Sequence, residues 1–184
     1  MLRFQDLPRS ELAWEDGAIG EEAVAAHLAA RCPGVVALHD RRMPGSRANI
    51  DHIAIAPSGV LVIDTKRLKG RIEVRRPLFG DPKLMVAGRD KTKLVAGLRR
   101  QVEAVRAALA IIEQDVPVGG CLCFVNPVGQ SGGSDIPLLR TLTIDGFPLF
   151  HPRRLSRHLN RQGPLGAEEI GVLAEALVEL LPAA

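Results

Sequence analysis

The sequence predicts a single compact α/β domain built from layers of helices and strands. Of its 184 residues, 46% are apolar and 24% are charged, which is typical of one globular domain with a buried core. Helical stretches and β-branched runs follow in the order helix, strands, helix, strand, unlike a regular βαβ succession. The run 118–125 is continuously apolar, which indicates a strand covered on both faces.

The first half of the chain supplies a helix and most of the strands. Residues 1–16 are a polar leader, and the Ala- and Glu-rich segment 17–31 predicts a helix that ends before Cys32-Pro33-Gly34. Two β-branched runs, 48–56 and 60–67, flank Pro57-Ser58-Gly59 and therefore predict a hairpin. The remaining expectations are strands at 35–40 and 71–75, a basic loop at 41–47 and a longer loop at 77–88.

The second half predicts helices around short strands. A long helical pattern covers 90–114 and places Leu94, Leu98, Val102, Val105 and Leu109 near one face, which should pack on the sheet. The glycine-rich stretch 126–134 lacks the Gly-Lys-Ser/Thr ending of a phosphate-binding loop and predicts a flexible surface loop. The other expected elements are strands at 118–125, 139–144 and 148–150 and helices at 153–160 and 167–181.

Composition excludes several classes of protein. No run of 18 apolar residues occurs and the first residues lack an apolar signal segment, so we expect a cytoplasmic protein with no membrane partner. Three cysteines, two of them alternating along one strand, form neither a disulfide framework nor a zinc site. Aromatic residues are 3% of the chain, which disfavours single-strand binding by base stacking.

Positive charge is concentrated in the middle of the sequence. Residues 41–106 hold sixteen Lys or Arg against six acids, an excess of ten positive charges, whereas the rest carries an excess of seven negative charges. A solvated basic face explains any single residue, but the clustered excess indicates a surface that meets anions. The candidate phosphate contacts are Arg41, Arg42, Arg47, Arg67, Lys69 and Arg71.

The predicted hairpin brings two carboxylates together. A two-residue loop at Pro57 and Ser58 pairs residues whose numbers add to 115, so Asp51 lies opposite Asp64, and Lys66 shares the face of Asp64. Opposed like charges roughly 5 Å apart destabilise a sheet unless a cation lies between them, and a divalent metal with Lys66 would supply one. A three-residue loop would move Asp51 out of this pairing.

Two further polar residues have competing interpretations. Glu21 lies on the helix stripe of Val24 and Leu28, where a buried acid needs a partner, but acids near a helix N-terminus are also favoured by the helix dipole. Gln101 lies near the stripe of Leu98, where its amide can bond backbone or support the site. His52 points away from Asp51, which indicates a structural role.

These residues resemble a known family. GAIGEE at 17–22, NIDHIAIAPSGVLVIDTKRLKGRI at 49–72 and Gln101 opening QVEAVRAAL are similar to the nuclease-related domain (NERD) of the PD-(D/E)xK restriction-endonuclease-like superfamily. The likeness covers about residues 17–125, and the specific part is the Asp, Gly turn, β-branched strand and Asp-x-Lys. One departure is Asp64, where NERD sequences more often carry Glu.

The resemblance implies a restriction-endonuclease-like core across residues 17–184, with a mixed central β-sheet flanked by helices. It also implies a metal-dependent nuclease. Asp51 and Asp64 would be metal ligands, Glu21 would match the family's helical acid, and Lys66 would lie beside the attacked phosphate. Hard carboxylates suit Mg²⁺ or Mn²⁺, and the substrate would be DNA cut with little sequence preference. Two alternatives from other classes stay open: a nucleic-acid-binding module that turns over poorly, and a regulatory partner-binding domain whose acids are structural. An Asp-x-Lys pair on a solvent-facing strand would fit the last.

Overall fold

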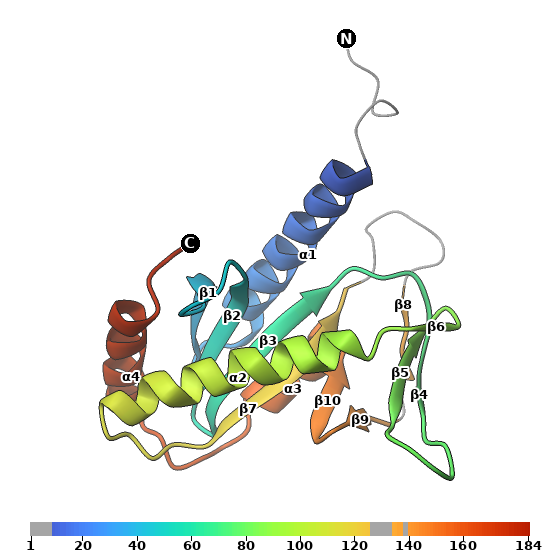
Figure 1. The fold of residues 1–184 in the computed structure, drawn as a ribbon. Coiled ribbons are helices and arrows are strands. Elements are labelled where there is room, and N and C mark those ends of the chain that lie inside the picture. The colour runs from blue at the N-terminus through green and yellow to red at the C-terminus, as the bar shows by residue number, and fades with distance from the viewer. Residues whose placement is uncertain (1–8, 126–133, 138–139) are drawn as a thin grey trace.

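A six-stranded sheet lies at the centre of the protein (Figure 1). The computed structural model describes residues 9–125, 134–137 and 140–184. The strand order is β1-β2-β3-β7-β10-β9; β3, β7 and β10 run parallel, and the other neighbours pair antiparallel. The α/β fold with a mixed central sheet is therefore confirmed.

The elements follow the predicted order, with added strands. The helices are α1 (Arg9–Arg31), α2 (Lys93–Ile111), α3 (Pro152–Leu159) and α4 (Ala167–Leu180). The strands of the central sheet are β1 (Val36–Arg42), β2 (Asn49–Ala56), β3 (Gly59–Lys66), β7 (Val118–Phe124), β9 (Leu142–Ile144) and β10 (Phe147–Phe150). A second sheet, of order β6-β5-β4-β8, contains β4 (Gly70–Arg75), β5 (Lys83–Val86), β6 (Arg89–Asp90) and β8 (Ser134–Asp135).

The central sheet is buried on both faces because alternate residues of its strands enter two apolar cores. Val62 of β3 belongs to the core under α2 and α4, whereas Ile63 belongs to the core under α1 and α3. Helix α2 approaches β7 at Gly120, where a Cβ atom would lie 2.6 Å from Val102 Cγ2. This close approach brings the inner face of α2 to the middle of the sheet.

The hairpin register is the predicted one. Residues of β2 and β3 pair from Ala56 with Gly59 to His52 with Ile63, all adding to 115. Gly59 has φ +125° and a Cβ there would lie 2.5 Å from Pro117 O, so a side chain would strain and clash. The two-residue loop at Pro57 and Ser58 therefore sets which residues of the two strands meet.

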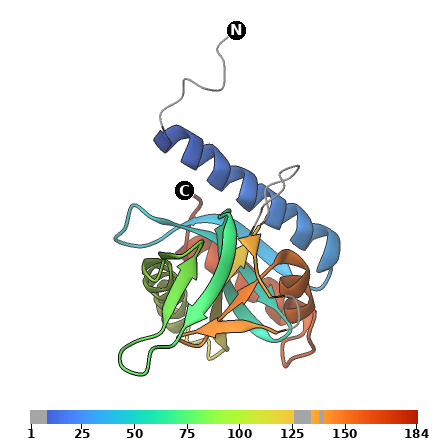
Figure 2. The ribbon, with the colours of Figure 1, turned by 90° about the vertical axis from the view of Figure 1, so that its right-hand side faces the viewer.

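Several expected boundaries were wrong. Helix α1 begins at Arg9 and not at residue 17, because a single glycine such as Gly17 costs a helix interior only about 1 kcal/mol relative to alanine. The expected loop at 77–88 contains β5, which pairs with β4 as a second hairpin that extends from the domain in Figure 2. The expected loop at 41–47 begins two residues later, because Arg41 and Arg42 pair with β2 as the end of β1.

Helix α2 begins at Lys93, later than expected, because Asp90 pairs with Met85 in a strand and accepts two hydrogen bonds from Thr92. Part of the leader (1–8), most of the glycine-rich stretch (126–133) and residues 138–139 lie outside the described residues. Over the part of the chain that the structure describes, no helix is long and apolar enough to cross a membrane.

Candidate active site

Strands β2 and β3 separate where their acidic residues lie. The backbone pairing ends at His52 and Ile63, one residue before Asp51 and Asp64 would pair. Instead, the Asp51 carboxylate accepts a hydrogen bond of 2.7 Å from the backbone N–H of Thr65. A side-chain oxygen thus takes the place of the backbone acceptor, and this holds the Asp51 carboxylate against β3.

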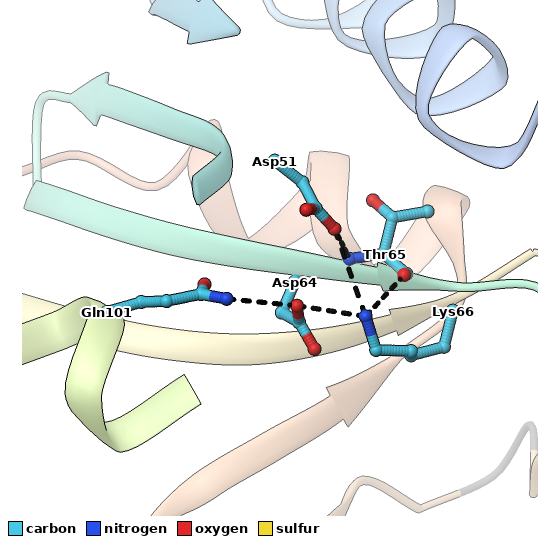
Figure 3. Close-up of polar contacts among 5 residues, drawn as sticks. All are labelled: Asp51, Asp64, Thr65, Lys66 and Gln101. Atoms are coloured by element: carbon cyan, nitrogen blue, oxygen red, sulfur yellow. Dashed lines mark hydrogen bonds and ion pairs between the residues drawn. The ribbon is translucent and has the colours of Figure 1, made fainter. Parts of the chain in front are cut away.

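Lys66 lies between the two carboxylates (Figure 3). Its Nζ donates to Asp64 Oδ1 at 2.9 Å and to the backbone oxygen of Thr65 at 2.9 Å, and it lies 4.0 Å from Asp51 Oδ2. Residues 64 and 66 share a strand face, so the ammonium folds back over its own strand to reach Asp64. The expected convergence of Asp51, Asp64 and Lys66 is therefore present in the geometry.

Gln101 reaches this cluster from α2. Its Nε2 donates to Asp64 Oδ1 at 3.2 Å, and both residues are buried. Gln101 Oε1 is also buried and has no hydrogen-bond partner among the described residues. Of the two interpretations of Gln101 from the sequence, the contact fits support of the site.

The cluster has more negative than positive charge. Burial and the neighbouring Asp64 raise the pKa of Asp51 from 3.8 to about 7, against the opposing effects of Lys66 and the Thr65 N–H. One ammonium therefore does not balance two carboxylates in this partly desolvated place. Additional positive charge at this site would therefore be stabilised by the two carboxylates.

Glu21 lies at the edge of the cluster without touching it. It is half-buried on α1, whereas the adjacent Glu22 is exposed, as the helical stripe predicts. Burial raises the pKa of Glu21, and Lys66 opposes that rise. Glu21 is thus coupled to the site through charge, and no hydrogen bond or ion pair joins it to another described residue.

The six candidate phosphate contacts are dispersed. Arg47 and Lys69 are exposed in connections, Arg42 is exposed at the end of β1, and Arg71 pairs with Glu73 at 3.2 Å on β4. Arg67 follows β3 directly and packs beside Gly20 of α1. Arg41 is half-buried, and its Nε is buried without a partner among the described residues.

Sequence patterns did not reveal a histidine pair next to the site. His52 is buried under α1, and its Nδ1 lies 2.8 Å from Nδ1 of His39 on β1, which supports the structural role expected for His52. Burial and His39 lower the pKa of His52 to about 3, so this ring is neutral. Only the register of β1 against β2, which pairs residues 39 and 52, could have revealed the contact.

The donor set fits a hard divalent cation. Asp51 and Asp64 offer carboxylate oxygens, and the unpartnered Oε1 of Gln101 is a further oxygen in the same place. Burial and the neighbouring Asp64 raise the pKa of Asp51 to about 7, and a bound cation would oppose that rise. Within the described ranges, no three or more acidic, His or Cys side chains gather closely enough to hold a metal ion.

A comparison with protein families agrees with this geometry. The family model of the nuclease-related domain (NERD) matches residues 16–125, which span α1, the hairpin of Asp51 and Asp64, Gln101 and β7. No curated protein and no solved structure matches the chain. Because the match covers more than half of the sequence and contains every residue of the cluster, the chain belongs to the nuclease-related domain family.

Proposed function

We propose that this protein is a metal-dependent nuclease that hydrolyses phosphodiester bonds of DNA with little sequence preference. One observation carries the proposal: Asp51 and Asp64 converge across two strands with Lys66 Nζ 2.9 Å from one carboxylate and 4.0 Å from the other. Two acids and a lysine at one point match the chemistry of phosphodiester hydrolysis, in which an anionic centre must be neutralised before attack.

Asp51 and Asp64 would hold Mg²⁺ or Mn²⁺, with Glu21 as the third acid. When bound, such an ion supplies a Lewis acid for a phosphate oxygen and lowers the pKa of a bound water. Asp51 must release its proton before it can bind the ion, since its pKa lies near 7. Gln101 orients the Asp64 carboxylate through the bond to Oδ1.

Lys66 would place positive charge beside the phosphate. Its ammonium already lies at the acidic cluster and is partly open to solvent, with 24% of the side chain exposed. An ammonium in that position stabilises the negative charge that develops on phosphate oxygens during attack. Basic side chains would contact the phosphate backbone of the nucleic acid without reading its bases; the candidates are Arg41, Arg42, Arg47, Arg67, Lys69 and Arg71. We expect the protein to act in the cytoplasm.

A second candidate function rests on a specific observation. The described residues gather no three Asp, Glu, His or Cys side chains closely enough to hold a metal ion, and Lys66 occupies the space between the carboxylates. A module that binds nucleic acid or a regulatory partner and turns over poorly would be built in the same way. The two functions differ in whether a metal acts at Asp64.

A plasmid cleavage assay with and without Mg²⁺ or Mn²⁺ separates the two functions. We expect the wild type to nick the plasmid only with metal, and Asp64→Asn, which keeps the side-chain volume, to lose cleavage. Asp81→Asn is the matched control, because it makes the same substitution at an exposed position between β4 and β5, and it should retain cleavage. Metal-independent or absent cleavage by the wild type would favour the binding module.

A further inference from the structure

A basic groove lies on the other face of the central sheet, beyond the part of the chain that the family model matches. It has a volume of about 570 Å³ and runs between the β9–β10 hairpin and α3. Thr141, Thr143, Pro148 and Phe150 form the strand side of the groove. The helix side carries the groove's positive charge, on Arg154, Arg157 and Arg161.

These three guanidinium groups have no acidic partner. None of them forms a hydrogen bond or an ion pair with another described residue, and the sequence has no Asp or Glu from 146 to 167. The nearest acid before this stretch, Asp145, is already paired with Arg99 at 2.8 Å. Unpaired arginines gathered on one side of a groove repel one another, so the groove favours a ligand with negative charge.

The arrangement of the charges indicates a polyanion. Arg154 and Arg157 lie three residues apart on α3, and Arg161 follows just after the helix ends; Arg157 and Arg161 are exposed. A single small anion is bound by donors that converge on one point, whereas a row of guanidinium groups fits successive phosphates. His158 stands beside Phe150 with ring centroids 5.2 Å apart, and burial together with Arg161 lowers the pKa of His158, so the positive charge of the groove comes from arginine.

The groove and the acidic cluster lie at the same part of the sheet. Thr65, between Asp64 and Lys66, pairs with Cys123 of β7, and Cys123 pairs with Phe150 in the groove wall. Two strand spacings of about 4.8 Å each separate the backbones of Thr65 and Phe150, roughly 10 Å in all. The cluster faces α2 and the groove faces α3, so a duplex that contacts both passes the ends of β3 and β10, where Lys66 and Phe150 lie.

We propose that the groove between α3 and the β9–β10 hairpin binds the phosphodiester backbone of the nucleic acid that the acidic cluster acts on. The inference rests on the proposed function, because it assigns a second contact to the same substrate. Arg157 and Arg161 hold phosphates on the side of the sheet away from α2. The contact is independent of base sequence, since guanidinium groups recognise phosphates alike in all sequences.

The test measures binding of the full chain to labelled duplex DNA by fluorescence anisotropy in EDTA, so that binding is read without cleavage. The variant is Arg157→Gln with Arg161→Gln; both side chains are exposed, so the fold should be kept. The control, Lys93→Gln with Arg100→Gln, removes the same charge from exposed positions on α2, across the sheet. Melting temperatures of both double variants check folding.

We expect the groove variant to bind about tenfold to a hundredfold more weakly at about 0.1 M salt, on two unrelated sequences alike. The slope of log affinity against log salt should decrease in magnitude by about two units, while the control keeps most of its affinity and slope. Unchanged DNA binding in the groove variant, or an equal loss in the control, would overturn the proposal. Unchanged binding is also the result that a groove for an acidic protein would give.

Two further measurements separate the possible failures. If Asp64→Asn abolishes metal-dependent cleavage but the groove variant binds DNA normally, the nuclease proposal stands and the groove proposal fails. If the wild type never cleaves but the groove variant loses DNA binding, the groove proposal stands for a binding protein. Inorganic phosphate is the last probe. If phosphate raises the melting temperature of the wild type and the groove variant still binds DNA normally, the groove binds single phosphates and the proposal is overturned.

Discussion

Asp51 and His52 are neighbours on β2, and their side chains lie in two different polar clusters on opposite faces of the sheet. Burial disfavours charge on both, raising the pKa of Asp51 to about 7 and lowering that of His52 to about 3. The partners differ: Asp51 has Lys66 and the N–H of Thr65, whereas among the described residues His52 has only His39. The Asp51 cluster therefore keeps charged groups, and Asp51 itself titrates near neutral pH. The two rings of the His52 cluster are packed together, and His52 is neutral.

The two clusters differ in what they can offer a ligand. The His52 ring is neutral and its Nδ1 is hydrogen-bonded to His39, so it offers no oxygen ligand to a hard cation such as Mg²⁺. A pair of carboxylates with one ammonium keeps surplus negative charge next to solvent, since 15% of the Asp51 side chain is exposed. We therefore expect functional chemistry on the face of Asp51, where carboxylates are kept although burial disfavours their charge.

Removing the ammonium should have the largest effect on stability. In Lys66→Met, two carboxylates lose their cation, and we expect the free energy of unfolding at pH 8 in EDTA to fall by about 3 kcal/mol. The loss should be smaller at pH 5, where Asp51 carries a proton. Urea denaturation at both pH values measures it, with Lys69→Met as the exposed control, expected within about 0.5 kcal/mol of wild type. A Lys66→Met protein as stable as wild type at pH 8 would show that the ammonium does not balance the acids.

Metal should stabilise the wild type through the same acids. At a concentration about a hundred times the dissociation constant, Mg²⁺ or Mn²⁺ adds about 2.7 kcal/mol to the free energy of unfolding and raises the melting temperature. Asp64→Asn removes one of two repelling charges, so it should be more stable than wild type without metal and respond less to it. Equal melting shifts in both proteins would mean that the metal binds elsewhere.

The two clusters should give opposite pH dependences of stability. His52 binds a proton in the unfolded chain below its ordinary pKa of 6.5 but resists it in the fold, so its contribution to stability rises with pH from about 3 to 6.5. Asp51 holds its proton more tightly in the fold, so its contribution falls from about pH 4 to 7. Each slope is at most about 1.4 kcal/mol per pH unit.

Substitution at one position should therefore expose the slope of the other. Relative to wild type, Asp51→Asn should gain stability as the pH rises from about 4 to 7, whereas His52→Leu should lose it from about 3 to 6.5. Asn keeps an oxygen acceptor for the N–H of Thr65, so the fold should tolerate it. Urea denaturation in EDTA across this pH range measures both, and curves parallel to wild type would contradict the assigned titrations.

The site could be predicted from sequence where it depends on local pairing. A two-residue loop sets the hairpin register, and that register places Asp51 beside the residues around Asp64. Helical spacing likewise separated half-buried Glu21 from exposed Glu22. These predictions succeeded because the interacting residues are close in the chain and regular structure sets their geometry.

Contacts between distant segments could not be predicted in the same way. The partner of His52 depends on how β1 pairs with β2, and strand β5 depends on the hairpin that β4 forms after the central sheet. Charge counted along the sequence favoured residues 41–106 and gave no weight to Arg154 and Arg157. They form a basic groove only because α3 packs beside β9 and β10, so that no acid lies opposite.

Glu21 offers the smallest and sharpest test of the acidic cluster, because its neighbour Glu22 is a matched control on the same helix. Glu21 is half-buried and interacts electrostatically with Lys66 and Asp64, whereas Glu22 is exposed. If Glu21 is the third acid, Glu21→Gln should weaken Mn²⁺ binding about tenfold, or about 1.4 kcal/mol, and Glu22→Gln should leave it unchanged. Isothermal titration calorimetry with Mn²⁺ measures both affinities.

The stability of the Glu21→Gln variant is the control. Because burial raises the pKa of Glu21, Gln also removes an unfavourable charge, so the variant should be no less stable than wild type without metal. Weaker Mn²⁺ binding together with unchanged or higher metal-free stability would separate a role in holding the ion from a role in holding the fold, and equal affinities in the two variants would remove Glu21 from the site.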